Sequence, residues 1–483
     1  MMPLPLSRIA QWTGGRLHGA DVLVDAFATD TRTLEAAGRS VLFVALKGER
    51  FDGHDHVAGA AGAGAAAALV SKLVDIPLPQ VVAADTERAL AAIATAMQQA
   101  RNTKVAAITG SNGKTSVKAL LWPILQQAAG AGVAYANPGN RNNEIGLPLA
   151  VIDAPEDAAF AVYEMGAGKP GDIAYLTAIV RPDAALVNNI APAHLERMGS
   201  LLGVADTKAA IYDALPPGGV AAINADDAFA PYFAERAHGR RLLRFGLEAS
   251  ADVTARDIQS DADGSRFTLV APQGAIEVRV PFPGRHNVRN ALAAASLALG
   301  LGATLEQVRD GLADAQPVAG RLVRHRLASG ALLVDDSYNA NPGSLNAAIE
   351  WLATLPQAWL VLGDMRELGE DARALHAEGG RRAKAAGVAR LYALGELSAA
   401  AVEGFGEGGR IFESHEALAS ALRADVAASA APTGGHVAAC AAPTSGSTPS
   451  GKDAPTILVK GSRGSAMDRV VRALLEGEAT HAA

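Results

Sequence analysis

A glycine-rich segment near residue 110 has the residue types that bind phosphate. It has the sequence Gly-Ser-Asn-Gly-Lys-Thr, follows an apolar run at 105–109 and precedes a helix-compatible run at 116–120. Backbone N–H groups of such a loop can surround an anion at a helix N-terminus, where a lysine reaches the terminal phosphates and a threonine hydroxyl can bind Mg²⁺. We therefore predict a nucleoside triphosphate site formed by Gly110, Ser111, Asn112, Gly113, Lys114, Thr115 and Ser116.

The spacing of this loop leaves a second interpretation open. The pattern Gly-x-x-Gly-Lys-Thr is shorter than the common phosphate-loop pattern Gly-x-x-x-x-Gly-Lys-Ser/Thr. An ordinary glycine-rich turn between a strand and a helix, with Lys114 exposed at the surface, has the same composition. The nucleotide-binding interpretation of this loop therefore depends on other polar residues near it.

Two such residues follow expected strands. Glu164 comes after the apolar run 159–163, and His194 follows the run 184–189. Ligands of open parallel sheets bind beyond the carboxyl ends of the strands, so both side chains should lie near the loop. Thr115 and Glu164 could supply the oxygen ligands of a hard divalent ion, and His194 could hold a second metal. Each residue alone is equally compatible with a helix cap or a solvated surface group.

Other polar segments could bind a substrate or could simply form turns. Residues 137–148 hold four asparagines within seven positions, which form either a self-capped loop or a platform for a polar substrate. Asn287 opens an Ala-rich helix, where it is a cap or reads an adenine edge. Lys208 lies on an expected helix and, by sequence alone, would be an exposed lysine.

The order of the expected elements predicts an α/β protein of three domains, which also agrees with a length of 483 residues. We expect a small N-terminal α/β module in residues 1–99 and a C-terminal Rossmann-like domain in 318–483. Between them, residues 100–317 should form a P-loop ATPase-like domain with a parallel sheet and a β-hairpin insertion at 252–280. Residues 427–455 are rich in Gly, Ser, Thr, Pro and Ala and are interpreted as a disordered insertion.

Composition excludes several classes of protein. The chain is 49% hydrophobic and 19% charged, with a net charge of −7 and no Lys/Arg cluster with interleaved aromatics, which argues against nucleic-acid binding. No apolar run approaches the roughly 18 to 20 residues of a membrane span, and the N-terminus lacks a secretory signal, so we expect a cytoplasmic protein. A single cysteine excludes an internal disulfide framework. Nothing requires more than a monomer.

Taken together and in order, the motifs resemble those of the Mur ligase family over nearly the whole chain. They are the phosphate loop at 109–115, the Asn-rich segment 140–148, the segments 164–166 and 284–287, His194, Lys208, and the segments 335–342, 362–365 and 460–463. Within the family, the pattern is most similar to members that join D-alanyl-D-alanine to UDP-N-acetylmuramoyl-tripeptide. The resemblance implies that ATP phosphorylates the terminal carboxylate of the tripeptide in the presence of Mg²⁺, and that the dipeptide amine then attacks the acyl phosphate.

The resemblance also assigns roles to residues. It implies catalytic roles for Lys114, Glu164, His194 and Lys208, and it implies that Lys208 is carbamylated. It also implies that metal is bound by Thr115, Glu164, His194 and Lys208. The resemblance further implies that Asn287 contacts adenine, Arg321 contacts phosphate and Asp336 contacts ribose. The N-terminal module should bind the UDP part of the substrate. The substrate candidates are Thr31, Arg32, Lys47, Asp52, Asn142 and Asn143.

Three alternatives remain open at this point. A sister ligase that adds the third, diamino residue usually carries an Asp-Asn-Pro-Arg signature, which the segment 335–342 lacks. A non-catalytic UDP-sugar-binding scaffold would bind ligands without releasing phosphate. A motor or switch NTPase would hydrolyse nucleotide without an acceptor amine. The sequence does not distinguish diaminopimelate from lysine in the tripeptide.

Overall fold

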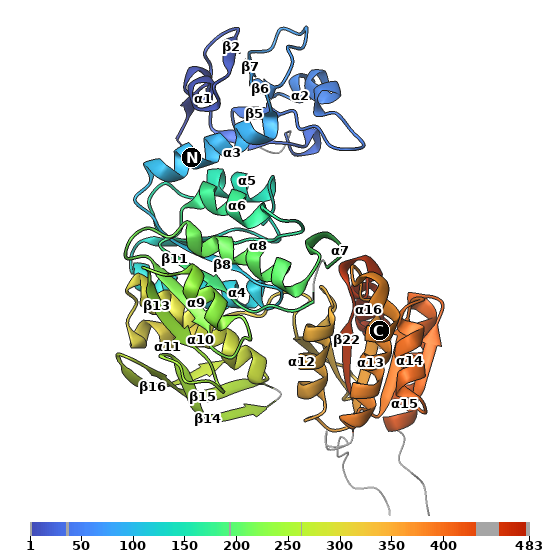
Figure 1. Ribbon diagram of the computed structural model, residues 1–483. Coiled ribbons are helices and arrows are strands. Elements are labelled where there is room, and N and C mark those ends of the chain that lie inside the picture. Colours follow the sequence, from blue (N-terminus) through green and yellow to red (C-terminus); the bar gives the residue numbers. More distant parts are fainter. Residues whose placement is uncertain (1, 35–37, 193–194, 262, 431–453, 480–483) are drawn as a thin grey trace, which may run out of the picture.

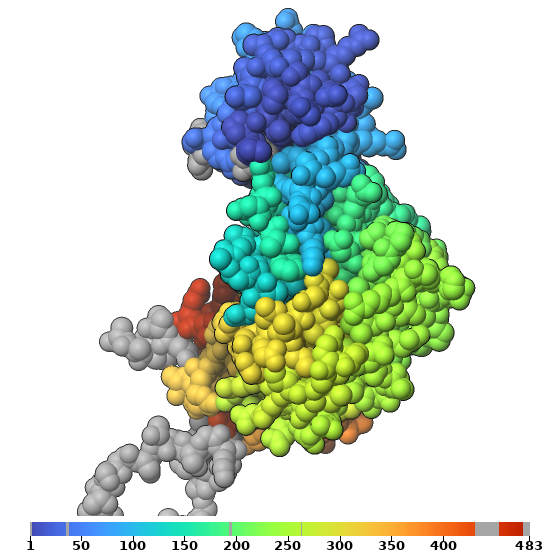
Figure 2. All heavy atoms as spheres, turned by 90° about the vertical axis from the view of Figure 1, so that its left-hand side faces the viewer, coloured from blue at the N-terminus to red at the C-terminus, as the bar shows by residue number. Residues whose placement is uncertain are grey.

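The computed structural model describes residues 2–34, 38–192, 195–261, 263–430 and 454–479. In Figure 1 the chain runs from an N-terminal module through a central domain to a C-terminal domain at its side, and Figure 2 shows the N-terminal residues as a lobe at one end. Within the described residues, no helix is both long enough and apolar enough to span a bilayer.

The central domain is built on a six-stranded parallel sheet with the order β13-β12-β11-β8-β10-β9. The chain starts in the middle of this sheet at β8 and passes to opposite sides of it, so a topological switch point lies beside β8. The phosphate loop follows β8. The strands are β8 (Lys104–Thr109), β9 (Val133–Ala136), β10 (Ala158–Glu164), β11 (Ala184–Val187), β12 (Val220–Asn224) and β13 (Arg241–Phe245).

Helices cover both faces of this sheet because the strand residues are apolar on both sides. On β8, Ala106 and Ile108 pack with α4, α10 and α11, whereas Val105 and Ala107 face the core shared with α5, α6 and α8. The helices are α4 (Lys114–Ala129), α5 (Gly146–Asp153), α6 (Asp172–Val180), α7 (Leu195–Met198), α8 (Leu201–Asp213), α9 (Ala230–Arg236), α10 (Arg285–Leu301) and α11 (Leu305–Asp314).

The insertion in the central domain has one strand more than we predicted. The expected hairpin is present as β15 (Gly264–Ala271) and β16 (Gly274–Val280), but β14 (Thr254–Asp261) pairs antiparallel with β15. Its residues are mostly exposed or half-buried, which is why β14 lacks an apolar alternation that would reveal it in the sequence.

The N-terminal module has a mixed five-stranded sheet with the order β2-β7-β6-β5-β4 and a two-stranded pair, β1 with β3. Its strands are β1 (Leu4–Pro5), β2 (Arg16–His18), β3 (Leu23–Val24), β4 (Ala26–Ala28), β5 (Val41–Val44), β6 (Ala67–Val70) and β7 (Gln80–Val82). Its helices are α1 (Leu6–Thr13), η1 (Thr31–Thr33), η2 (Gly53–His56), α2 (Val57–Gly62) and α3 (Thr86–Ala100).

The C-terminal domain has a second six-stranded sheet, β17-β18-β22-β19-β20-β21, in which only β17 is antiparallel. Its strands are β17 (Val323–Arg326), β18 (Leu332–Asp336), β19 (Ala358–Gly363), β20 (Arg390–Leu394), β21 (Gly409–Phe412) and β22 (Thr456–Lys460). Its helices are α12 (Pro342–Leu352), η3 (Gly369–Asp371), α13 (Ala372–Ala385), α14 (Ser398–Phe405), α15 (His415–Ala430), η4 (Arg463–Ser465) and α16 (Asp468–Ala479).

The predicted boundaries of the insertion and of the domains fall close to the ends of helices. The insertion was expected to begin at residue 427, but α15 continues to Ala430, so its first four residues are helical; most of the remainder lies outside the described residues. We still propose domain boundaries after residues 99 and 317. The first falls one residue before the end of α3, and the second falls between α11 and β17.

Candidate nucleotide and acyl-transfer site

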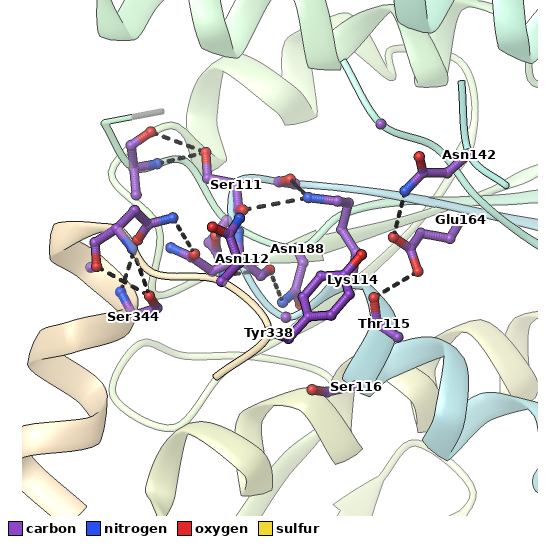
Figure 3. Close-up of a pocket in the computed structure, with 18 of the residues that line it drawn as sticks. Ser111, Asn112, Lys114, Thr115, Ser116, Asn142, Glu164, Asn188, Tyr338 and Ser344 are labelled. Atoms are coloured by element: carbon purple, nitrogen blue, oxygen red, sulfur yellow. Dashed lines mark hydrogen bonds between the residues drawn. The ribbon is translucent and has the colours of Figure 1, made fainter. Parts of the chain in front are cut away.

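A cavity of about 720 Å³ lies where the carboxyl ends of β8, β10 and β11 face the first turns of α12 and the ends of β18 and β22 (Figure 3). The central and C-terminal domains therefore both line it. The predicted residues that line it are Gly110, Ser111, Asn112, Gly113, Lys114, Thr115, Ser116, Asn142, Asn143, Glu164, Lys208, Asn287, Arg321 and Asp336.

The phosphate loop has the backbone that its glycines predict. Gly113 has φ of +79°, and a Cβ there would lie 2.5 Å from Nδ2 of Asn188 and 2.6 Å from Oδ1 of Asn290. Helix α4 begins at the next residue, Lys114, whose Nζ donates to the carbonyl of Gly110 at 2.6 Å. Burial lowers the pKa of Lys114, and Arg321 adds to this effect against the opposing charge of Glu164. The ammonium group thus lies over the loop that would bind phosphate.

Glu164 lies at the end of β10 and is only 3% exposed. Its Oε2 accepts from the Thr115 hydroxyl at 2.8 Å, and its Oε1 accepts from Asn142 Nδ2 at 2.9 Å (Figure 3). Burial alone would raise the pKa of this carboxyl, but the charges of Lys118 and Lys114 and these hydrogen bonds lower it overall. Glu164 and Thr115 therefore present adjacent hard oxygen atoms, a donor set that fits Mg²⁺.

Asn137 fixes the backbone of Glu164 from the neighbouring loop. Its side-chain Oδ1 accepts from the Glu164 N–H at 2.9 Å, and its Nδ2 donates to the Glu164 carbonyl at 3.1 Å. Asn137 is buried, so this segment of the Asn-rich run is structural. Asn143 instead caps the next turn through the N–H of Gly146.

Lys208 is buried rather than exposed, with 2% of its surface accessible, although it lines the cavity. Burial, with a smaller contribution from the charge of Lys114, lowers its pKa from 10.5 to about 7. A large fraction of this amine is consequently neutral near neutral pH, the form that reacts with CO₂.

A row of asparagine amides connects α10 to the phosphate loop. Asn287 Nδ2 donates to the Pro283 carbonyl, and its Oδ1 accepts from Asn290 at 3.1 Å. Asn290 Oδ1 in turn accepts from Asn188 Nδ2 at 3.1 Å, and Asn188 Nδ2 also donates to the carbonyl of Asn112 in the phosphate loop at 2.9 Å. Asn287 therefore has partners on both sides of its amide within the protein, and Asn188 and Asn290 are site residues that our sequence analysis did not identify.

The C-terminal domain reaches the phosphate loop directly. Arg321 Nη2 donates to the Thr115 hydroxyl at 2.9 Å, and its guanidinium stacks on Tyr338 at 4.3 Å. Asn341, the N-cap of α12, donates to Asn112 Oδ1 at 2.6 Å. These contacts bring the two domains together at the residues predicted to bind phosphate.

Asp336 lies beside a lysine at the edge of the same cavity. Lys460 Nζ is 2.5 Å from its carboxylate, and burial raises the pKa of Asp336 against the opposing effect of that lysine. Nearby, burial together with the charges of Lys460 and Arg289 lowers the pKa of His286 to about 4, so this imidazole is neutral. Tyr338, Asn341, Lys460 and His286 stand within motifs that the sequence analysis quoted without assigning them a role.

The N-terminal candidates do not line this cavity. The Arg32 guanidinium pairs with Asp30, Thr31 begins η1, and Lys47 pairs with Asp52 in an isolated β-bridge. Asp52 caps η2 and lies 2.5 Å from His54 Nδ1. These interactions are those of ordinary turns and caps, and a substrate role for these four residues stays a prediction.

His194 lies outside the described residues. Within the residues that are described, no group of three or more His, Cys, Asp or Glu side chains is placed to hold a metal ion.

The chain has a parallel sheet, a phosphate loop after the central strand of this sheet, and a second α/β domain that contacts the loop. These features define a class of nucleotide-binding enzymes whose site lies between two domains. Residues 108–298 match the Mur ligase middle domain, and residues 320–442 match the Mur ligase, glutamate ligase domain. The chain belongs to the Mur ligase family.

Individual relatives match most of the chain or nearly all of it. It is 42% identical over 478 residues to UDP-N-acetylmuramoyl-tripeptide--D-alanyl-D-alanine ligase of Escherichia coli (strain K12), which covers 99% of each chain. The ligase of the same name from Bacillus subtilis (strain 168) is 34% identical over 416 residues, or 84% of this chain and 88% of that one.

Solved structures agree with this assignment. Crystal structure I of MurF from Acinetobacter baumannii superposes with a TM-score of 0.89 at 32% identity, covering 99% of both chains. MurF ligase from Thermotoga maritima in complex with ADP gives a TM-score of 0.80 at 26% identity, covering 95% of this chain and 99% of that one. The three-domain architecture predicted from the sequence is confirmed.

Proposed function

We propose that this protein joins D-alanyl-D-alanine to the terminal carboxylate of UDP-N-acetylmuramoyl-tripeptide with consumption of ATP, in peptidoglycan precursor synthesis. The observation that carries the proposal is a single cavity in which the phosphate loop meets Arg321 and Asp336 of the C-terminal domain. A carboxylate is a poor electrophile, and phosphorylation by ATP gives it a good leaving group. The dipeptide amine then attacks the acyl carbon, and ADP and phosphate are released.

The residues of the cavity suit the first step. Bringing a carboxylate to the γ-phosphate crowds several negative charges, which fixed cations and N–H donors can stabilise in the transition state. Lys114 would leave the Gly110 carbonyl for the terminal phosphates, and Arg321 would reach the same phosphates from the opposite domain. Asp336 would contact the ribose, and Asn287, with Asn290 behind it, would lie against adenine.

We further propose that Mg²⁺ is held by Thr115 and Glu164, with His194 and Lys208 at a second metal position. The bound ion would neutralise phosphate charge and orient the oxygens of the reacting groups. The low pKa of Glu164 keeps its carboxylate ionised and ready for a cation.

Lys208 suits carbamylation. Its buried amine, with a pKa of about 7, provides the neutral nucleophile that CO₂ requires. Carbamylation would change the Lys208 side chain from a cation, which the Lys114 ammonium repels, into an anion, which the ammonium attracts. The product would face the metal positions as a carboxylate does.

The substrate is proposed to extend from the cavity to the N-terminal module. Asn142 and Asn143 line the cavity and would contact the peptide part, whereas Thr31, Arg32, Lys47 and Asp52 are candidates for the UDP-sugar. We propose that the protein acts as a monomer in the cytoplasm, where ATP and nucleotide-linked precursors are available.

An acceptor-dependence assay tests this function. ADP release is measured with ATP, Mg²⁺ and one of three donors: UDP-N-acetylmuramoyl-tripeptide ending in diaminopimelate, the same compound ending in lysine, or UDP-N-acetylmuramoyl-dipeptide. Each donor is tested with D-alanyl-D-alanine, diaminopimelate or lysine as the acceptor, and without an acceptor. We expect ADP release that depends on both the tripeptide and D-alanyl-D-alanine. Release with a diamino acid on a dipeptide donor would indicate the sister ligase, and release without any acceptor would indicate an NTPase.

A further inference from the structure

Lys118 is a buried lysine that the proposed chemistry does not use. It lies on α4 one turn after Lys114 and is 8% exposed. Its Nζ donates to the carbonyls of Asn137 at 2.8 Å and Gly139 at 3.1 Å, and it lies 3.4 Å from Glu164 Oε2. The ammonium group thus donates to two carbonyls of one loop and pairs its charge with the carboxylate at the end of β10.

These partners connect the two ends of one loop to one carboxylate. Asn137 and Gly139 begin the loop 137–143, and Asn142 near its end donates to Glu164 Oε1 at 2.9 Å. The carbonyl of Asn142 also accepts from the N–H of Gly166, two residues after Glu164. Lys118 thus binds the start of the loop and one carboxylate oxygen, while Asn142 binds the other oxygen.

We propose that Lys118 is a positioning residue that holds the loop 137–143 and the Glu164 carboxylate in one geometry, and so couples the metal ligand to the binding of the tripeptide substrate. Lys118 does not itself line the cavity, whereas Asn142, Asn143 and Glu164 do. It therefore acts through those residues. The inference rests on the proposed function for the identity of the substrate.

The buried position explains why a lysine is needed. Without its ammonium group, two backbone carbonyls would lose a donor in a site with little access to water, and Glu164 would lose its nearest counter-charge. Lys114 does not replace it, because its Nζ is bonded to the carbonyls of its own loop. The loop and the carboxylate would then relax independently.

Two equilibrium measurements test the coupling in Lys118→Met. Calorimetry gives the affinity for UDP-N-acetylmuramoyl-tripeptide without nucleotide, and electron paramagnetic resonance gives the affinity for Mn²⁺ with a non-hydrolysable ATP analogue. Loss of a residue that is hydrogen-bonded to a metal ligand typically lowers metal affinity or activity by about 10- to 100-fold. We therefore expect both affinities to fall by about tenfold or more. The KM for D-alanyl-D-alanine should stay unchanged, which a general loss of structure would not produce.

Lys104→Met is the matched control. Lys104 also donates its Nζ to a backbone carbonyl, that of Leu301, but it lies at the opposite end of β8. It should leave both affinities unchanged. If Lys118→Met does not fold, Lys118→Gln, which keeps one N–H₂ donor and removes the charge, is measured against the same criteria.

The outcomes separate this inference from the function on which it rests. Unchanged tripeptide affinity in the Lys118 variant, with a wild-type enzyme that shows acceptor-dependent ADP release, overturns the inference alone. Absence of acceptor-dependent ADP release in the wild type overturns the proposed function instead. Equal losses for the tripeptide and for D-alanyl-D-alanine would also overturn the inference, because they indicate general damage.

Discussion

Replacing Lys208 with methionine should stabilise the central domain, and the gain should shrink as pH rises. Lys208 is buried in the protein with a pKa of about 7, against an ordinary value of 10.5. Below pH 7 the amine is protonated in both the folded and the unfolded chain, and the folded state carries the full cost of the buried cation. At about 1.4 kcal/mol per pH unit, this cost is about 5 kcal/mol.

Between pH 7 and 10.5 the unfolded chain binds more protons at this site than the folded protein does, so stability rises with pH. The cost that methionine removes is therefore about 3 kcal/mol at pH 8 and about 1 kcal/mol at pH 9.5. Methionine has a similar length, no charge and enough flexibility to fit the buried site. The pH dependence of the gain, more than its absolute size, identifies the buried amine as its source.

The free energy of unfolding is measured by urea titration. Unfolding is followed by pulsed hydrogen exchange of the peptide that contains α8, because this peptide reports the central domain separately from the other two domains. Buffers are depleted of CO₂, because a carbamate would change the charge on Lys208. Lys104→Met at the exposed start of β8 is the control, because it makes the same substitution at a lysine that water reaches. An equal effect of Lys208→Met at pH 8 and 9.5, or a larger gain at pH 9.5, would refute the reasoning.

Three further substitutions test the loop, the domain contact and the core. Gly113→Ala should abolish nucleotide binding measured by calorimetry, since a Cβ at φ +79° would lie 2.5 Å from the Asn188 amide nitrogen; wild-type affinity would contradict this. Asn341→Ser keeps an N-cap for α12 but not the hydrogen bond to Asn112, so we expect the KM for ATP to rise about two- to tenfold with unchanged thermal stability. Tyr212→Phe removes a buried hydroxyl that bonds two backbone groups of the central sheet, which should cost about 1–3 kcal/mol in urea titrations without changing kcat.

The central domain could be predicted from local patterns. The phosphate loop combines glycines, a lysine and a threonine in a short segment, and its strand and helix are found at Lys104–Thr109 and Lys114–Ala129. The strands that deliver Glu164 and Asn188 are apolar and short, as buried parallel strands are. These strands, the loop and its helix depend on residues that are close together in the sequence, so local sequence patterns predict them.

Long-range contacts explain what was missed. Lys118 and Lys208 look like solvated helix lysines, yet each lies on the apolar stripe of its helix, with Leu121 three positions after Lys118 and Tyr212 four positions after Lys208. That register was a usable signal. The two carbonyls that Lys118 binds, in contrast, come from a loop about twenty residues away, and no local pattern identifies them.

Contacts between domains could not be predicted for the same reason. Arg321 and Asn341 reach Thr115 and Asn112 across more than 200 positions of sequence. Only the resemblance to a family indicated that the third domain contributes to the nucleotide site. The structure adds the atoms that meet there.

Transfer of ¹⁸O from the tripeptide tests the central claim most directly. UDP-N-acetylmuramoyl-tripeptide labelled with ¹⁸O in both oxygens of its terminal carboxylate is incubated with the enzyme, ATP, Mg²⁺ and D-alanyl-D-alanine, and the phosphate and the peptide product are analysed by mass spectrometry. An acyl phosphate places one labelled oxygen in the released phosphate and leaves the other in the new amide. Phosphate without label, released together with ligated product, would contradict the account.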